Sequence, residues 1–123
     1  MTPSRDHAPS VATLRRPDLE LVIPTLVVAE ATYLIGRRLG PEAEAAFLRG
    51  LGQIDVEPPT SDDWERIADL VDDYADLSLG GTNASVVTLA ERLDAAVVIT
   101  LDRRRFTVVR PRHREALELL PAT

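Results

Sequence analysis

The sequence predicts an α/β fold in which a parallel sheet lies between helices on both of its faces. Short apolar segments alternate along the chain with longer segments whose apolar residues recur at helical spacing, a pattern typical of parallel α/β domains. The continuous apolar run from Ala95 to Leu101 supports this, because strands buried on both faces lack polar alternation. For 123 residues, 45% of them hydrophobic, we expect one domain spanning residues 1–123.

The first predicted strand and helix follow each other directly. The strand is the apolar segment from Leu19 to Pro24, whose final proline can open a helix. The helix is predicted from Thr25 to about Arg38, and Gly40 with Pro41 provides its stop. Apolar residues cover most of its circumference, so we expect this helix to be largely buried.

Two further helices flank a short strand in the middle of the chain. The first is expected from Glu42 to about Leu51, the strand from Gln53 to Glu57, and the second helix after Ser61, a favoured N-cap residue. Acidic residues of the second helix are expected on the solvated surface: Asp69, Asp72, Asp73 and Asp76. Its inward face is expected to carry Trp64, Ile67, Ala68, Val71 and Tyr74.

The remaining chain is predicted to contain a helix, two strands and a last helix. The first helix runs from Thr82 to Leu93 after a Gly-Gly break, and the buried strand from Ala95 to Leu101 follows. A small strand is expected from Phe106 to Val109 and a short polar helix from about Arg112 to Leu120. The inward residues of the Thr82 helix are expected to be Ala84, Val87, Ala90 and Leu93.

Composition excludes several classes of protein. The chain has 14 Lys plus Arg and 20 Asp plus Glu, and its formal charge of −6 argues against broad, sequence-independent nucleic-acid binding. It has no cysteine, which excludes disulfides, a thiolate nucleophile and a Cys-based zinc site. No apolar run approaches the ~18 residues that span a bilayer. We therefore expect a soluble, cytoplasmic protein that does not bind membranes.

Three polar residues stand out from their surroundings. Glu30 lies in a nearly all-apolar helix, where burying an unpaired charge costs several kcal/mol. Its carboxylate therefore needs a partner or a cation. The alternatives are that Glu30 forms a helix-end salt bridge or lies on an exposed stripe of the helix. Asp102 follows a parallel strand, where ligands collect, although it can instead cap the next turn. Asn83, at a helix start, is structurally ordinary. The arginines Arg103 to Arg105 are expected to pair with surface acids rather than with phosphate.

The segments IPTLVVAE, LGGTNASVVTLAERL and VVITLDRRRF, in this order and spacing, resemble the motifs of VapC-type PIN domains. The resemblance extends from about Asp18 to Pro121. It implies a parallel sheet between helices and the activity of a magnesium-dependent endoribonuclease toxin. It also implies RNA as substrate, a small antitoxin protein as partner, and homodimers.

The resemblance assigns site residues one by one. Glu30 matches the family glutamate and Asp102 the last family aspartate, which implies that both bind Mg²⁺. Asn83 stands where the family has a catalytic aspartate. No residue between Met1 and Pro17 matches the first family aspartate, so we expect that the chain starts late and lacks the first central strand. With two of four acidic positions, we expect weak or absent Mg²⁺ binding and impaired activity.

Two other hypotheses stay open. A non-catalytic toxin remnant would bind an antitoxin or a partner toxin through the apolar helix from Thr25 to Leu39, and metal binding distinguishes it from an enzyme. A phosphoacceptor receiver module is disfavoured, because such a module needs a lysine and the chain contains none. The hydroxyls of Thr100 and Ser85 lie near the expected site, but satisfying backbone groups is their favoured role.

Overall fold

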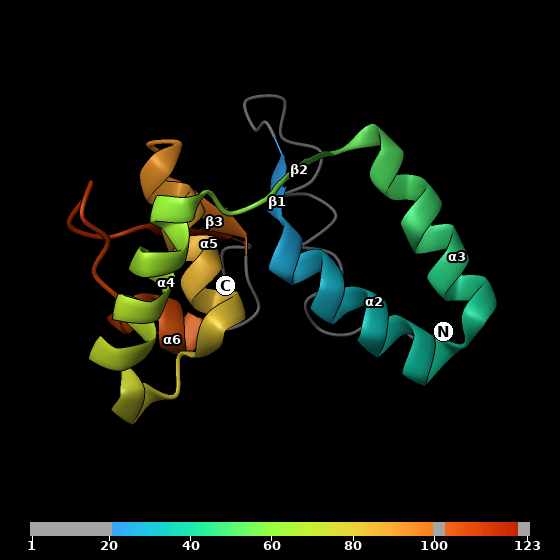
Figure 1. Cartoon of the computed structure of the whole chain (residues 1–123), viewed down its shortest axis with the longest axis horizontal. Coiled ribbons are helices and arrows are strands. Elements are labelled where there is room, and N and C mark those ends of the chain that lie inside the picture. Colours follow the sequence, from blue (N-terminus) through green and yellow to red (C-terminus); the bar gives the residue numbers. More distant parts are fainter. Residues whose placement is uncertain (1–20, 100–102, 121–123) are drawn as a thin grey trace. The chain divides into compact units, whose positions relative to one another are not determined.

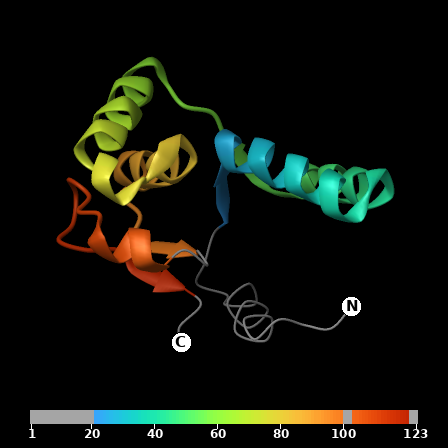
Figure 2. The same ribbon diagram turned by 90° about the horizontal axis from the view of Figure 1, so that it is seen from below.

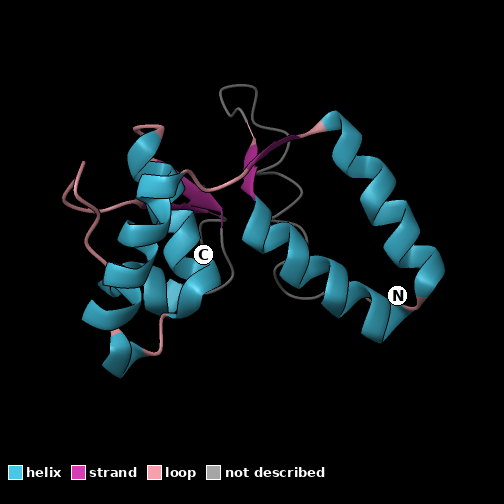
Figure 3. Cartoon of the chain, in the orientation of Figure 1, coloured by secondary structure: helices cyan, strands magenta, loops and turns pink. Residues whose placement is uncertain are grey.

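The computed structural model describes residues 21–99 and 103–120 of the chain. It is an α/β structure, mostly helical, with short parallel strands (Figure 3). Two compact units are distinguished, one formed by Leu21–Leu89 and the other containing the described residues from Ala90 onward.

The first unit begins with two parallel strands and two helices between them (Figure 1). Strand β1 pairs in parallel with strand β2, and Val22 lies opposite Asp55. Strand β2 is shorter than the sequence predicts, since a 3-10 turn, η1, occupies Leu51–Gln53 before it. The bounds of the strands and helices are β1 Val22–Pro24, α2 Thr25–Leu39, α3 Pro41–Gly50 and β2 Asp55–Glu57.

Gly40 joins α2 to α3. Its backbone has φ +91° and ψ 176°, a conformation that essentially only glycine adopts. The Gly40 N–H still donates to Gly36 O at 3.1 Å, so it closes the last turn of α2, and its carbonyl accepts from Glu44 N at 3.2 Å in α3. The sequence prediction of a stop at Gly40 and Pro41 is confirmed.

The expectation that α2 is largely buried is wrong. None of its residues is buried, and Leu39 exposes 62% of its surface. The apolar side chains of α2 itself point to nearly every side of the helix. Helix α3, its main contact within the unit, covers only some of them. Nor is any helix in the described ranges long and apolar enough to cross a membrane.

Helix α4, Ser61–Asp73, begins with a capping box. Thr60 Oγ1 accepts from Asp63 N at 3.2 Å, while Asp63 Oδ2 accepts from Thr60 N at 2.9 Å. This pairing satisfies two backbone donors at the helix start. The N-cap is therefore Thr60, and the predicted N-cap Ser61 is one residue too late.

The inward face of α4 differs from the predicted one. Ile67 is buried as expected, but the other buried residues are Asp63 and Leu70. Trp64 is 51% exposed, and Ala68 is exposed too. The capping box turns Asp63 inward, so the buried stripe runs through positions 63, 67 and 70. The predicted solvent exposure is confirmed for Asp69, Asp72, Asp73 and Asp76.

Helix α5, Gly80–Arg92, follows the 3-10 turn η2, Ala75–Leu77. It starts two residues before the predicted Thr82, because Gly80 and Gly81 both enter the helix. The predicted burial of its inward residues is confirmed for Ala84, Val87 and Ala90, whereas Leu93, just past the helix end, is exposed.

The described part of the second unit begins at Ala90, in the last turn of α5. Ala95 N donates to Ala90 O at 2.8 Å and Asp94 N to Glu91 O at 3.2 Å, while Asp94 adopts a left-handed φ of 53°. This is a Schellman motif, with Asp94 in the position that glycine usually occupies. It turns the chain from α5 into strand β3, Val97–Ile99.

Two predictions for the end of the chain are wrong. The expected strand from Phe106 to Val109 instead lies in the last turn of helix α6, Arg103–Val108, and the residue after it. Phe106 and Val109 are buried at a spacing of three, which fits one helix face. The expected helix from Arg112 to Leu120 is instead a bend followed by strand β4, Glu118–Leu120. Strand β4 lies parallel to β3, and the two run side by side in Figure 2.

Candidate functional site

Glu30 lies in the second turn of α2, and its side chain is exposed. Glu30 would need a partner if α2 were buried, but no residue of this helix is buried. An exposed carboxylate remains hydrated and needs no compensating charge. Glu30 therefore presents accessible oxygen atoms rather than a buried charge.

Asn83 lies near the start of α5 and is half-buried. Its Nδ2 donates to Leu79 O at 3.1 Å, so the amide joins the helix to the residue just before it. An aspartate at this position has no N–H to offer and cannot make this hydrogen bond. The amide thus has a structural role at the place where the family resemblance implies a carboxylate.

Asp102, the third predicted site residue, lies outside the described residues, as does Thr100. Within residues 21–99 and 103–120, no group of three or more His, Cys, Asp or Glu side chains is placed so that it could hold a metal ion. Glu30 and Asn83 belong to the same compact unit. Of the expected Mg²⁺ ligands, the described part of the chain provides one carboxylate, that of Glu30.

The hydroxyls of α5 are used within the helix itself. Ser85 is buried and donates to Thr82 O at 2.6 Å, and the buried Thr88 donates to Ala84 O at 2.9 Å. Each hydroxyl therefore satisfies a backbone carbonyl. The expectation that the Ser85 hydroxyl satisfies a backbone group is confirmed.

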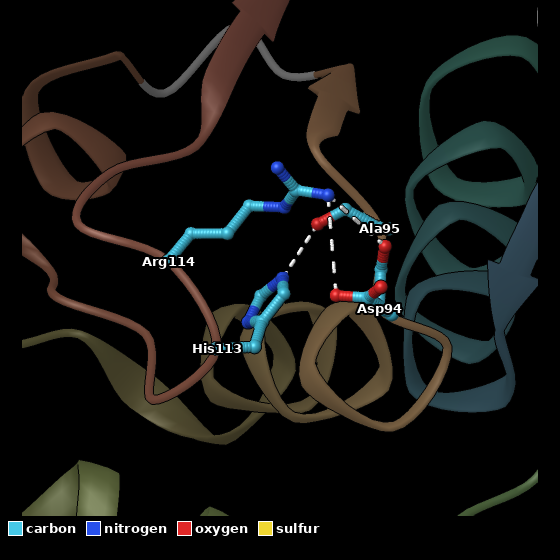
Figure 4. Close-up of polar contacts among 4 residues, drawn as sticks. All are labelled: Asp94, Ala95, His113 and Arg114. Atoms are coloured by element: carbon cyan, nitrogen blue, oxygen red, sulfur yellow. Dashed lines mark hydrogen bonds and ion pairs between the residues drawn. The ribbon is translucent and has the colours of Figure 1, made fainter.

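Sequence reasoning missed the polar contacts that fix the segment after α6. His113 Nε2 lies 2.6 Å from Ala95 O, and Arg114 forms an ion pair with Asp94 at 3.9 Å (Figure 4). Arg112 N donates to Glu91 Oε2 at 2.7 Å. These partners are about twenty residues apart in sequence, and no local motif signals them.

The sequence of the chain is similar to those of known proteins. A family model described as PIN domain matches residues 1–111. Ribonuclease VapC26 of Mycobacterium tuberculosis (strain ATCC 25618 / H37Rv) is 36% identical over 108 residues, which cover 86% of this chain and 80% of that protein. The matched region includes Glu30, Asn83 and Asp102.

Proposed function

Because the chain belongs to the PIN domain family, we propose that it is a VapC-type endoribonuclease toxin that acts in the cytoplasm. The observation that carries the proposal is its identity of 36% with a protein named ribonuclease, over 86% of this chain. RNA is then its substrate class, a small antitoxin its protein partner, and a homodimer its working form.

We further propose that Glu30 and Asp102 bind Mg²⁺. Magnesium prefers hard oxygen ligands, usually one or two carboxylates together with water and phosphate, and the exposed Glu30 carboxylate suits that requirement. When bound, such an ion supplies a polarised water and stabilises charge on the phosphodiester. Within the described residues, Glu30 is the one member of this expected ligand set.

The third position, Asn83, supports the proposal of an impaired enzyme. A neutral amide brings one charge fewer than the family aspartate and cannot accept a proton as a base. Its nitrogen is already bonded to Leu79 O. Asn83 is therefore a weakened member of the catalytic set, and we expect slow or undetectable cleavage of RNA.

Cleavage of a mixed RNA by the purified full chain, in Mg²⁺ and in a chelator, tests this function. We expect little cleavage by the natural chain and a gain of at least roughly tenfold with Asn83→Asp, comparable to effects of outer ligands on metal sites. Gln53→Glu adds the same charge at an exposed site in η1 and serves as control.

The outcomes separate the two parts of the proposal. Strong Mg²⁺-dependent cleavage by the natural chain, lost with Glu30→Gln or Asp102→Asn but kept with Asp69→Asn, would show an unimpaired ribonuclease. A folded chain that cleaves no RNA, with or without Asn83→Asp, would contradict the ribonuclease proposal itself.

The second candidate is a non-catalytic protein that binds an antitoxin or a partner toxin. The apolar side chains that α2 exposes favour it: Tyr33, Leu34 and Leu39. Exposed apolar groups gathered on one helix are typical of interaction sites. Partner binding by a chain that shows neither Mg²⁺ binding nor cleavage would support this candidate over the enzyme.

A further inference from the structure

Positive charge is concentrated in one short segment of this acidic chain. Residues 103–114 contain six arginines and no Asp or Glu. The rest of the chain contains the other eight arginines and all 20 acidic residues, so its formal charge is −12. The overall charge of −6 therefore conceals a local basic segment.

Buried apolar residues anchor this segment and direct its arginines outward. Phe106 and Val109 are almost fully buried, and Pro111 is buried as well. Around these anchors, four described arginines are exposed: Arg104, Arg110, Arg112 and Arg114. The segment thus combines buried apolar residues with a set of solvent-exposed arginines, its charged face.

Three contacts hold the end of the segment in place. Arg112 N donates to Glu91 Oε2. His113 Nε2 contacts Ala95 O, and Arg114 pairs with Asp94 (Figure 4). A carbonyl can only accept, so Nε2 of His113 carries the proton in this bond. A charged face held in one arrangement loses less conformational freedom when it binds a ligand.

The four exposed arginines differ in whether contacts within the chain already hold their guanidinium groups. Two of them are held. Arg110 donates to Thr107 O at 2.6 Å and to Val109 O at 3.3 Å, and Arg114 pairs with Asp94. By contrast, no hydrogen bond or ion pair within the described residues holds the guanidinium of Arg104 or Arg112.

We propose that residues 104–112 form a phosphate-binding strip for the backbone of RNA, with Arg104 and Arg112 as its main contacts. This inference rests on the proposed function for the substrate class. Guanidinium groups match phosphate oxygens in geometry and charge. Such contacts position the nucleic acid without reading its bases. In an otherwise acidic protein, they bring the polyanion to one place on the surface.

The composition of the strip favours RNA over an acidic protein. Protein interfaces are built on a buried apolar or aromatic centre surrounded by polar groups. Within residues 104–112, Val108 is the one large apolar side chain that is exposed. Arginines without an apolar centre are typical of contacts with a phosphate backbone.

Binding of a fluorescent single-stranded RNA in a chelator tests the strip apart from any cleavage. For single strands, each phosphate contact contributes a slope of about −0.7 in log affinity against log salt, or roughly fivefold at 0.1 M salt. The double variant Arg104→Ala/Arg112→Ala should therefore bind roughly 25-fold more weakly, with a slope shallower by about 1.4. Arg38→Ala/Arg49→Ala, which removes two exposed charges from α2 and α3, should change affinity less than about twofold.

A third variant separates charge from folding. Arg104→Lys/Arg112→Lys should bind within roughly threefold of the natural chain, since lysine also contacts phosphate. Equal weakening by the two alanine pairs, unchanged affinity in Arg104→Ala/Arg112→Ala, or an absence of RNA binding by the natural chain would each overturn the strip.

Cleavage in Mg²⁺ is measured separately on the same proteins. A chain that cleaves RNA although its two alanine pairs bind RNA alike would overturn the strip and leave the ribonuclease proposal intact. A chain whose RNA binding falls as expected, but which never cleaves RNA, would support the strip and contradict the proposed activity.

Discussion

Helices α2 and α5 are similar in length and lie in very different environments. α2 is apolar on nearly every side and has no buried residue. In contrast, α5 buries six residues, two of which carry hydroxyls. The six are Ala84, Ser85, Val87, Thr88, Leu89 and Ala90. The hydroxyls of Ser85 and Thr88 bond to the helix's own carbonyls. Hydroxyls that are hydrogen-bonded within their own helix can be buried, and apolar composition alone does not locate a core.

The largest effect is expected from one substitution made in both helices. Leu89 in α5 is only 7% exposed, and Leu39 in α2 is 62% exposed. Leu89→Ala leaves a cavity and should lower the free energy of unfolding by about 2–5 kcal/mol. Leu39→Ala should change it by less than about 0.5 kcal/mol. Urea denaturation of both variants measures the difference.

A particular result would sharpen this contrast. If Leu39→Ala destabilises the chain by more than about 1 kcal/mol, and the loss grows with protein concentration, a second molecule covers α2 in solution. Equal losses for the two variants at every concentration would contradict the difference in burial between the helices.

Helices α2 and α4 also differ in how they begin. α2 starts after Pro24 with no side-chain cap, whereas the start of α4 is held by Thr60 and Asp63. Thr60→Ala should lower the free energy of unfolding by about 1 kcal/mol. Ser61→Ala, which removes a hydroxyl one residue further on, should have almost no effect. Thermal unfolding of both variants decides which residue is the N-cap, and a larger loss for Ser61→Ala would reject the observed capping box.

The sequence predicted elements well where local signals agree with packing. Gly40 and its following proline mark the end of α2, and the helical spacing of Ala84, Val87 and Ala90 identifies the buried face of α5. The resemblance to VapC-type PIN domains, read from three motifs, is also confirmed.

Predictions failed where long-range contacts decide the structure. Strand β4 forms because Glu118 N bonds to Ala96 O at 2.7 Å, and no local pattern in a polar segment announces that pairing. Phe106 and Val109 suit a strand or a helix equally in so short a segment. For the candidate site, the sequence identified Glu30 and Asn83 as notable, but the exposure of Glu30 and the bond from Asn83 to Leu79 O depend on packing.

The smallest expected effects concern these two residues and return to the contrast between α2 and α5. Asn83→Asp replaces a donor with an acceptor facing Leu79 O, so in a chelator it should lower the free energy of unfolding by about 0.5–1 kcal/mol. Glu30→Gln changes an exposed group and should stay within about 0.5 kcal/mol. Denaturation at neutral pH measures both. A larger loss for Glu30→Gln would mean that its carboxylate has a structural partner, whereas no loss for Asn83→Asp would mean that the bond to Leu79 O contributes little and that an aspartate fits this position in α5.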